Sequence, residues 1–317
     1  MSTELSAQEP LVSVVMAVHN GASTLASSLS SILNEQEGVP LELLVLNDGS
    51  IDGTELLLDQ FAAADSRLRV WHRPQRGLTA SLIELCEQAR APFIARQDAG
   101  DRSLPGRLQR QLSHLQRHSA ASLCSCHARF VLSAAESDGA GLVLHQATPS
   151  AEQLRDGLTG PAHHGAVMMR TAAYRQVGGY RSMFRFAQDI DLWSRLVETG
   201  SHDVIPEILY EAEVNAGSIS GVQGPEQRRF HHVIRCAARA RRAGRSEQPW
   251  LQRAERLSQR CRRRPAGLRR RARGTYFIAC CLLPHHPDLA RTHLQSALAL
   301  DPTHLRARVR LALLESH

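Results

Sequence analysis

Two carboxylates follow a short apolar run in the segment FIARQDAGDRSLPGRL, residues 93 to 108. Asp98 and Asp101 are three apart, and Gly100 lies between them. Carboxylates of this kind can hold a hard cation such as Mg²⁺ against substrate phosphates. Residues three apart on a strand point to opposite faces, so a shared ion requires a bend, which glycine permits. Two alternatives are that Asp98 binds alone through waters, or that Asp101 caps the helix expected from Pro105.

A second acidic pair begins the segment QDIDLWSRL, where Asp189 and Asp191 are two apart at the predicted start of a helix. Residues two apart on a helix do not face the same way, so the two carboxylates cannot share one task. A positioned carboxylate can act as a general base in group transfer. We therefore expect one acid to be available for catalysis, while the other caps the helix or pairs with an arginine such as Arg195.

Apolar runs and helical periodicity alternate four times before residue 120, which predicts an α/β fold with a parallel sheet covered on both faces. Such sheets bind ligands beyond the carboxyl ends of their strands. His19, Asp48 and Asp98 follow three of these runs, so we expect them to converge. The predicted strands are Leu11–Val18, Leu41–Leu46, Leu68–Trp71 and Pro92–Arg96, and the predicted helices cover 22–34, a stretch from about Asp52, 78–90 and a stretch from Pro105.

The middle of the chain has a less regular pattern. Predicted extended segments are 122–132, 165–170 and 204–214, and a loop is expected over 134–141. Helices are expected over 151–158, over 171–177 and through the segment RFAQDIDLWSRLVETG, with Gly200 as its stop. In that last helix Trp193 is spaced with Ile190 and Leu196, which favours a core position.

The C-terminal third is predicted to be helical and strongly basic, since residues 225–275 contain 17 arginines and three acidic residues. Three interpretations compete: a solvated helical face, an anionic membrane surface and nucleic acid. Basic residues are not interleaved with aromatic ones, so we expect no nucleic acid partner. The segment ARTHLQSALALDPTHLRARVRLALLE resembles part of a tetratricopeptide-type helix pair.

Several classes of protein are disfavoured by composition. All 38 basic residues are arginine, so a P-loop or a lysine Schiff base is impossible. The longest apolar runs fall short of the ~20 residues of a membrane span, and no signal peptide is recognisable at the start. The seven cysteines have no metal-ligand spacing and suggest reduced thiols. These features predict a cytoplasmic protein, which the basic helices would place peripherally on the inner face of the membrane.

Six motifs occur in a fixed order: SVVMAVHN, LVLNDGSIDGT, RGLTASL, IARQDAGDRSLPGRLQRQ, GGYR and AQDIDLWSRL. Together they resemble family 2 glycosyltransferases of the GT-A fold over about residues 11–215. The resemblance implies a GT-A domain at 1–222, followed by a basic helical region at 223–317. It also implies inverting, metal-assisted transfer of a hexosyl group from a nucleotide-diphosphate sugar to a hydroxyl of a glycan or lipid-linked saccharide, in polysaccharide biosynthesis.

The resemblance assigns the donor site residue by residue. Ala17, His19 and Asp48 would contact the base and ribose, although Asp48 could instead order its own turn. Arg76 would meet a phosphate, or is a plain surface arginine. Asp98 would bind the donor through the ion.

The metal site departs from the family pattern. Asp98 and Asp101 would hold Mg²⁺ or Mn²⁺, but Gly100 stands where the family usually has its second acid.

The resemblance aligns the catalytic base with Asp189 rather than Asp191. It places His164 near the acceptor, together with Trp193 or Asp191. Neighbouring histidines on an extended segment point apart, so we do not expect His163 and His164 to share a metal.

Three rival functions differ in class. A catalytically inactive relative could act as a binding or scaffold protein in a glycan-assembly complex, and Gly100 is its main support. A sugar nucleotidyltransferase usually needs a glycine-rich first loop and a lysine, neither of which is present. An oxidoreductase would need G-x-G-x-x-G after the first strand, where the chain reads AVHNGAST.

Overall fold

The computed structural model describes residues 9–132, 143–147, 161, 163–216, 224–262, 267–284 and 286–315. The chain divides into two compact units. The first unit contains residues 1–128 and 147–212, and the second contains 129–146 and 213–317. The predictions for 134–141 and 151–158 fall outside the described residues.

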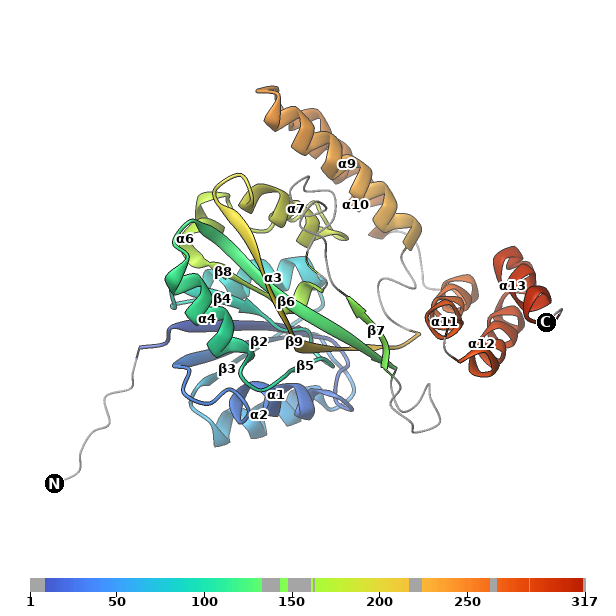
Figure 1. Ribbon diagram of the computed structural model, residues 1–317, viewed down its shortest axis with the longest axis horizontal. Coiled ribbons are helices and arrows are strands. Elements are labelled where there is room, and N and C mark those ends of the chain that lie inside the picture. Colours follow the sequence, from blue (N-terminus) through green and yellow to red (C-terminus); the bar gives the residue numbers. More distant parts are fainter. Residues whose placement is uncertain are drawn as a thin grey trace. The chain divides into compact units, whose positions relative to one another are not determined.

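Four parallel strands form one half of the sheet in the first unit, in the order β3-β2-β1-β4 (Figure 1). Strands β1 and β2 pair from Val12↔Leu41 to Val18↔Asn47, so both end at the same edge. The prediction of a parallel sheet is therefore confirmed for these strands. They are β1 (Val12–Val18), β2 (Leu41–Asp48), β3 (Leu68–Arg73) and β4 (Phe93–Arg96).

Helices cover both faces of this half, with α1 and α2 on one side and α3 on the other (Figure 1). Val15, Leu44, Leu82 and Ile94 are fully buried between the sheet and its helices. The fourth helix begins at Arg107 rather than at Pro105, because Gly106 has a left-handed backbone with φ of 79°. The helices are α1 (Leu25–Leu33), α2 (Thr54–Ala64), α3 (Leu78–Glu87) and α4 (Arg107–Arg117).

The sheet becomes antiparallel beyond β4, so the whole sheet is mixed. Strand β8 pairs with β4 and β6, and β5 pairs with β9 with Ser103 opposite Tyr210. This last pairing brings a late part of the chain beside the acidic turn. The elements are β5 (Arg102–Ser103), β6 (Ala121–Leu132), β7 (Val143–Ala147), the 3₁₀ turn η2 (His164–Ala166), β8 (Val167–Arg170), α6 (Thr171–Gln176), α7 (Gln188–Leu196) and β9 (Ser201–Val214).

The second unit is mainly helical. Its helices α11, α12 and α13 bury two apolar clusters, and α12 and α13 lie on either side of the Asp301-Pro302 break, where the sequence predicts a helix pair. Over the described part of the chain, no helix is both long enough and apolar enough to cross a membrane. The helices are α9 (Gly224–Arg242), α10 (Gln248–Arg262), α11 (Leu268–Leu282), α12 (Pro287–Leu300) and α13 (Leu305–Glu315).

Candidate active site

The acidic turn after β4 gathers three potential metal ligands. One ligand atom from each of Asp98, Asp101 and His163 lies within 4.8 Å of the other two. The His163 Nδ1 atom is 3.8 Å from an oxygen of Asp98 and 3.6 Å from an oxygen of Asp101. Gly100 has φ of 99°, so the chain bends between the two acids at the residue that allows it. Both predicted carboxylates therefore face one point.

Tyr210 fixes this bend from the far side of the turn. Its hydroxyl donates to Asp101 Oδ2 at 2.8 Å and accepts the backbone N–H of Asp98 at 3.1 Å. The ring is fully buried, with the guanidinium of Arg107 4.9 Å from its centre. Gly165 makes this approach possible, because a Cβ there would lie 1.8 Å from the Tyr210 hydroxyl oxygen. A single phenol thus links the two acids.

Arg96 provides the positive charge next to the acids. Its buried guanidinium bonds to Asp98 Oδ1 and donates to the Val15 carbonyl at 3.2 Å. Burial alone would raise the pKa of Asp98, but Arg96, and then His163 and His164, outweigh it and lower that pKa below its usual value. Asp98 is therefore ionised at neutral pH.

His163 and His164 face different ways, as predicted for neighbours on an extended segment. His163 Nδ1 accepts the N–H of Gly165 at 3.1 Å, and burial lowers the pKa of this imidazole, so the ring is neutral. His164 turns to the Tyr180 hydroxyl, 2.7 Å from its Nε2, and its ring meets the edge of Trp193. Two carboxylates form an oxygen donor set that fits Mn²⁺ or Mg²⁺, and His163 can add a nitrogen ligand when its Nδ1 lone pair is released from the Gly165 N–H.

Asp189 lies in the first turn of α7 with its carboxylate partly buried. Burial raises its pKa to about 6, against opposing backbone hydrogen bonds, and the negative charge of Asp98 adds to the rise. The charge of the acidic turn therefore contributes to the pKa of Asp189. Oδ1 accepts the N–H of Ile190 at 2.9 Å. A carboxylate with a pKa of about 6 is well matched to accepting a proton near neutrality.

Asp191 and Trp193 occupy buried positions on the same helix. Asp191 is fully buried and accepts from Arg195 at 2.6 Å, while Arg181 lies 3.6 Å from its other oxygen. The predicted pairing of one acid with Arg195 is confirmed. Trp193 is 6% exposed and belongs to the core cluster that also contains Leu192.

The predicted donor residues meet at the tips of β1 and β2. Both oxygens of Asp48 accept backbone N–H groups, from Arg76 at 2.7 Å and from Gly77 at 2.8 Å. His19 Nδ1 is 2.9 Å from the Asp48 carbonyl oxygen, and its ring is exposed, as is the side chain of Arg76. Ala17 is partly buried. Asp48 therefore joins the end of β2 to the start of α3, rather than ordering its own turn beside Gly49.

Sequence reasoning missed three residues of this site: Arg96, His163 and Tyr210. The only signal for Arg96 was a charged residue at the end of an apolar strand. His163 and Tyr210 come from segments more than 60 residues after the acidic turn. Their approach depends on the antiparallel pairing of β5 with β9 and on the tight turn at η2.

Comparison with known proteins gives a consistent result. Residues 13–178 match the family described as glycosyl transferase family 2. The chain is 35% identical over 207 residues to a protein of Bacillus subtilis named as glycosyltransferase EpsE, over 64% of this chain and 72% of that protein.

Two solved structures share the GT-A fold. Staphylococcus aureus TarS, residues 1–349 in complex with UDP, superposes with a TM-score of 0.57 at 15% identity, over 96% of this chain and 88% of that one. The mannosyltransferase PcManGT of Pyrobaculum calidifontis, in complex with GDP-mannose and Mn²⁺, has a TM-score of 0.57 at 17% identity, over 97% and 84%. With the family match covering more than half of its length, the chain belongs to glycosyl transferase family 2.

Proposed function

We propose that this protein transfers a hexosyl group from a nucleotide-diphosphate sugar to a hydroxyl of a glycan or lipid-linked saccharide, with inversion and with the help of a divalent cation. The observation that carries the proposal is the cluster of Asp98, Asp101 and His163, together with the Asp189 carboxylate at the start of α7, whose pKa burial raises to about 6. Donor activation and proton removal need those two kinds of group close together.

The donor would bind along the tips of β1 and β2. Asp48 holds the turn at Arg76 through two backbone hydrogen bonds, and it keeps lone pairs for a ribose hydroxyl or a base N–H. The exposed imidazole of His19 can stack on a base, and Ala17 leaves room beside it. The exposed guanidinium of Arg76 can reach a phosphate.

Asp98, Asp101 and His163 would hold Mg²⁺ or Mn²⁺. When bound, the ion would neutralise charge on the departing diphosphate. The protein's own contribution is to keep these ligands in place and in the right protonation state. Tyr210 fixes Asp101, and Arg96 keeps Asp98 ionised.

Asp189 would accept the proton of the acceptor hydroxyl as that oxygen attacks the anomeric carbon. Proton removal by a positioned base typically contributes ~10²–10⁴-fold to the rate. Asp191 is a poor candidate for this role, because its carboxylate is buried and paired with Arg195. His164 and Trp193 would act on the acceptor side only through their packing around His163 and α7.

The rival proposal is an inactive scaffold protein, and its main support was Gly100 in place of an acid. The bend at Gly100 brings Asp101 into the cluster, so two acids still face one point. This geometry favours the enzyme over the scaffold.

We also propose that the protein acts in the cytoplasm, in polysaccharide biosynthesis, and reaches the inner face of the membrane through α11. Leu268 is 59% exposed at the start of that helix, beside the exposed Arg269 and Arg271. Helices that lie on an anionic lipid surface combine apolar side chains with arginines, and Leu268 and its neighbouring arginines would be the part of α11 that contacts the lipid. Sedimentation with phosphatidylglycerol vesicles would test this: Leu268→Asp should release the protein, and unchanged sedimentation would refute the assignment.

The transferase proposal can be tested by calorimetric titration with a panel of nucleoside diphosphates, with and without Mn²⁺. We expect one nucleotide to bind tightly, with an affinity that falls in chelator and loses its ion dependence in Asp98→Ala. Sugar transfer from the matching donor should vanish in Asp189→Asn while nucleotide binding persists. Equal binding in chelator would refute the metal assignment, and full transfer by Asp189→Asn would refute the base.

A further inference from the structure

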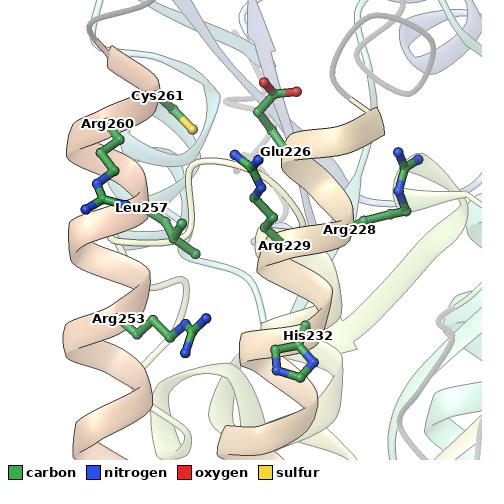
Figure 2. Close-up of a pocket in the computed structure, with 8 residues that line it drawn as sticks. All are labelled: Glu226, Arg228, Arg229, His232, Arg253, Leu257, Arg260 and Cys261. Atoms are coloured by element: carbon green, nitrogen blue, oxygen red, sulfur yellow. The ribbon is translucent and has the colours of Figure 1, made fainter.

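A cleft of about 700 Å³ lies between α9 and α10 in the second unit (Figure 2). The two helices pack against each other and are joined by a short connection after Arg242. Arg229 and His232 of α9 line it, as do Arg253 and Leu257 of α10. The cleft is thus built from two helices of one unit.

Within the described part of the chain, the arginines around this cleft have no acidic partners. Arg228, Arg229, Arg253 and Arg260 are exposed, and none of them forms an ion pair with a carboxylate among the described residues. Elsewhere on the same hairpin, Arg241 of α9 does pair with Glu247, at 2.5 Å. Guanidinium groups left open around a concavity suit anionic oxygens, which they bind in a bidentate manner.

The spacing of the charges favours a long ligand. Arg253 and Arg260 are two helical turns apart on α10, which is ~10 Å along the helix axis. A compact anion such as one phosphate group would contact both only if the two side chains bent toward each other. A ligand that carries negative groups at intervals along a chain can do so, and Leu257 provides an apolar surface between the two positions.

Glu226 distinguishes between possible anionic chains. It is 5% exposed at the end of the cleft, and its Oε2 atom is buried with no hydrogen-bond partner among the described residues. A buried acceptor of this kind is costly unless a donor reaches it. The negative charge of Glu226 would repel phosphate oxygens at this end of the cleft at neutral pH, whereas a sugar hydroxyl could donate to the carboxylate once the side chain turns toward the cleft.

We infer that the α9–α10 cleft binds an extended acidic saccharide chain, with carboxylate groups on the arginines and a hydroxyl on Glu226. Binding itself is independent of the transfer reaction. Only the further step, that this chain is the acceptor or the product, rests on the proposed function.

The test measures fluorescence anisotropy of a short labelled oligogalacturonate with the full-length protein. We expect binding that a neutral maltooligosaccharide of the same length does not compete. Arg229→Gln combined with Arg253→Gln should weaken binding about tenfold or more, which is about 1.4 kcal/mol. The matched control combines Arg235→Gln with Arg256→Gln, which removes the same charge from exposed positions outside the cleft and should change binding less than about threefold. An equal loss in the two double variants would overturn the inference, since it would show only a diffuse positive field.

Glu226→Leu gives a test of sign. Removing a negative charge should strengthen the binding of any simple anion, including inorganic pyrophosphate. If a sugar hydroxyl donates to Glu226, the same change should weaken the binding of oligogalacturonate. Stronger oligogalacturonate binding by Glu226→Leu would refute the saccharide ligand. The saccharide would also be refuted if the binding of anionic lipid vesicles required Arg229 and Arg253 while the binding of oligogalacturonate did not. Thermal melting followed by circular dichroism checks that the variant is folded.

The two proposals can fail separately. Asp98→Ala should bind oligogalacturonate as the wild type does, and Arg229→Gln with Arg253→Gln should bind nucleotide normally. If the wild-type protein binds nucleotide but does not bind oligogalacturonate, this inference is refuted and the transferase proposal stands. If it binds oligogalacturonate but no nucleotide, the transferase proposal is refuted and this inference stands.

Discussion

The two units use arginine in opposite ways. In the first unit, Arg96, Arg107 and Arg195 are almost fully buried, and each is held by carboxylates, amides or carbonyl groups. In the second unit, Arg229 and Arg253 are exposed around a cleft and have no acidic partner among the described residues. One residue type therefore fixes the geometry of a site in one unit and remains available to a ligand in the other.

The largest expected effect lies in the first unit. Asp189→Asn should lower kcat by ~10²–10⁴-fold, because the amide cannot accept the proton of the attacking hydroxyl. Transfer assays with the matching donor measure this loss, and nucleotide affinity serves as the control. If the comparison of the two units holds, Arg229→Gln should leave kcat with a short neutral acceptor unchanged. A loss of kcat in that variant would break the comparison.

Removing a buried arginine should destabilise the fold strongly. Arg195→Met leaves the buried Asp191 with Arg181, 3.6 Å from its other oxygen, as its remaining charged partner, and breaking a buried pair typically costs ~3–5 kcal/mol. Urea unfolding followed by circular dichroism measures the free energy of unfolding. Asp191→Leu combined with Arg195→Met removes both charges, and it should recover most of the loss. A stable single variant would show that Arg181 alone satisfies Asp191.

The pH profile reports on Asp189. Its pKa of about 6 is raised by burial, so the carboxyl becomes protonated as the pH falls through 6, and the base is lost. The logarithm of kcat/KM should then decrease with unit slope below about pH 6, tenfold for each pH unit. A flat profile down to pH 5 would mean that another group accepts the proton. Circular dichroism at each pH excludes unfolding as the cause.

Tyr210→Phe should have a smaller and more specific effect. It removes the hydrogen bond to the Asp101 carboxylate, worth ~1.5–3 kcal/mol for a charged acceptor, and also the one that the phenol accepts from the Asp98 N–H. Metal-dependent nucleotide binding should therefore weaken about tenfold or more, while binding in chelator stays the same. If the hydroxyl rather than the ring positions Asp101, Tyr210→Leu should weaken metal-dependent nucleotide binding no more than Tyr210→Phe does. An unchanged metal dependence in Tyr210→Phe would refute this positioning role.

Exposed arginines should matter least for stability. Arg229→Gln and Arg253→Gln should each change the free energy of unfolding by less than ~0.5 kcal/mol, because surface positions without partners contribute little. Urea unfolding compares them directly with Arg195→Met. A loss of several kcal/mol would show that these side chains stabilise the helices. The arginines of the second unit would then have a structural role, as those of the first unit do.

The strand tips could be predicted from the sequence because local patterns determine them. Unbroken apolar runs mark the parallel strands, and residues such as Asp48 and Asp98 follow directly after two of them. The bend at Gly100 could also be argued, since only the backbone freedom of glycine lets Asp101 turn toward Asp98. These conclusions need no knowledge of contacts between distant segments.

The remainder of the site depends on long-range packing, which local patterns do not contain. Tyr210 reaches Asp101 because Tyr210 in β9 pairs with Ser103 in β5. Hydrophobic alternation alone does not determine this register. Helical spacing indicated that the C-terminal arginines lie outside the core. It could not indicate that Arg229 and Arg253 line the same cleft on two different helices.

The close approach of Tyr210 to Gly165 has an evolutionary consequence. An alanine at 165 would place its methyl carbon 1.8 Å from the phenol oxygen, so that substitution is tolerated only if the aromatic side chain changes as well. Across homologous chains the two positions should therefore co-vary: glycine at the first with tyrosine at the second, and larger residues at the first only where the second has become smaller. Substitutions at these two positions, which are 45 residues apart in the chain, therefore depend on each other.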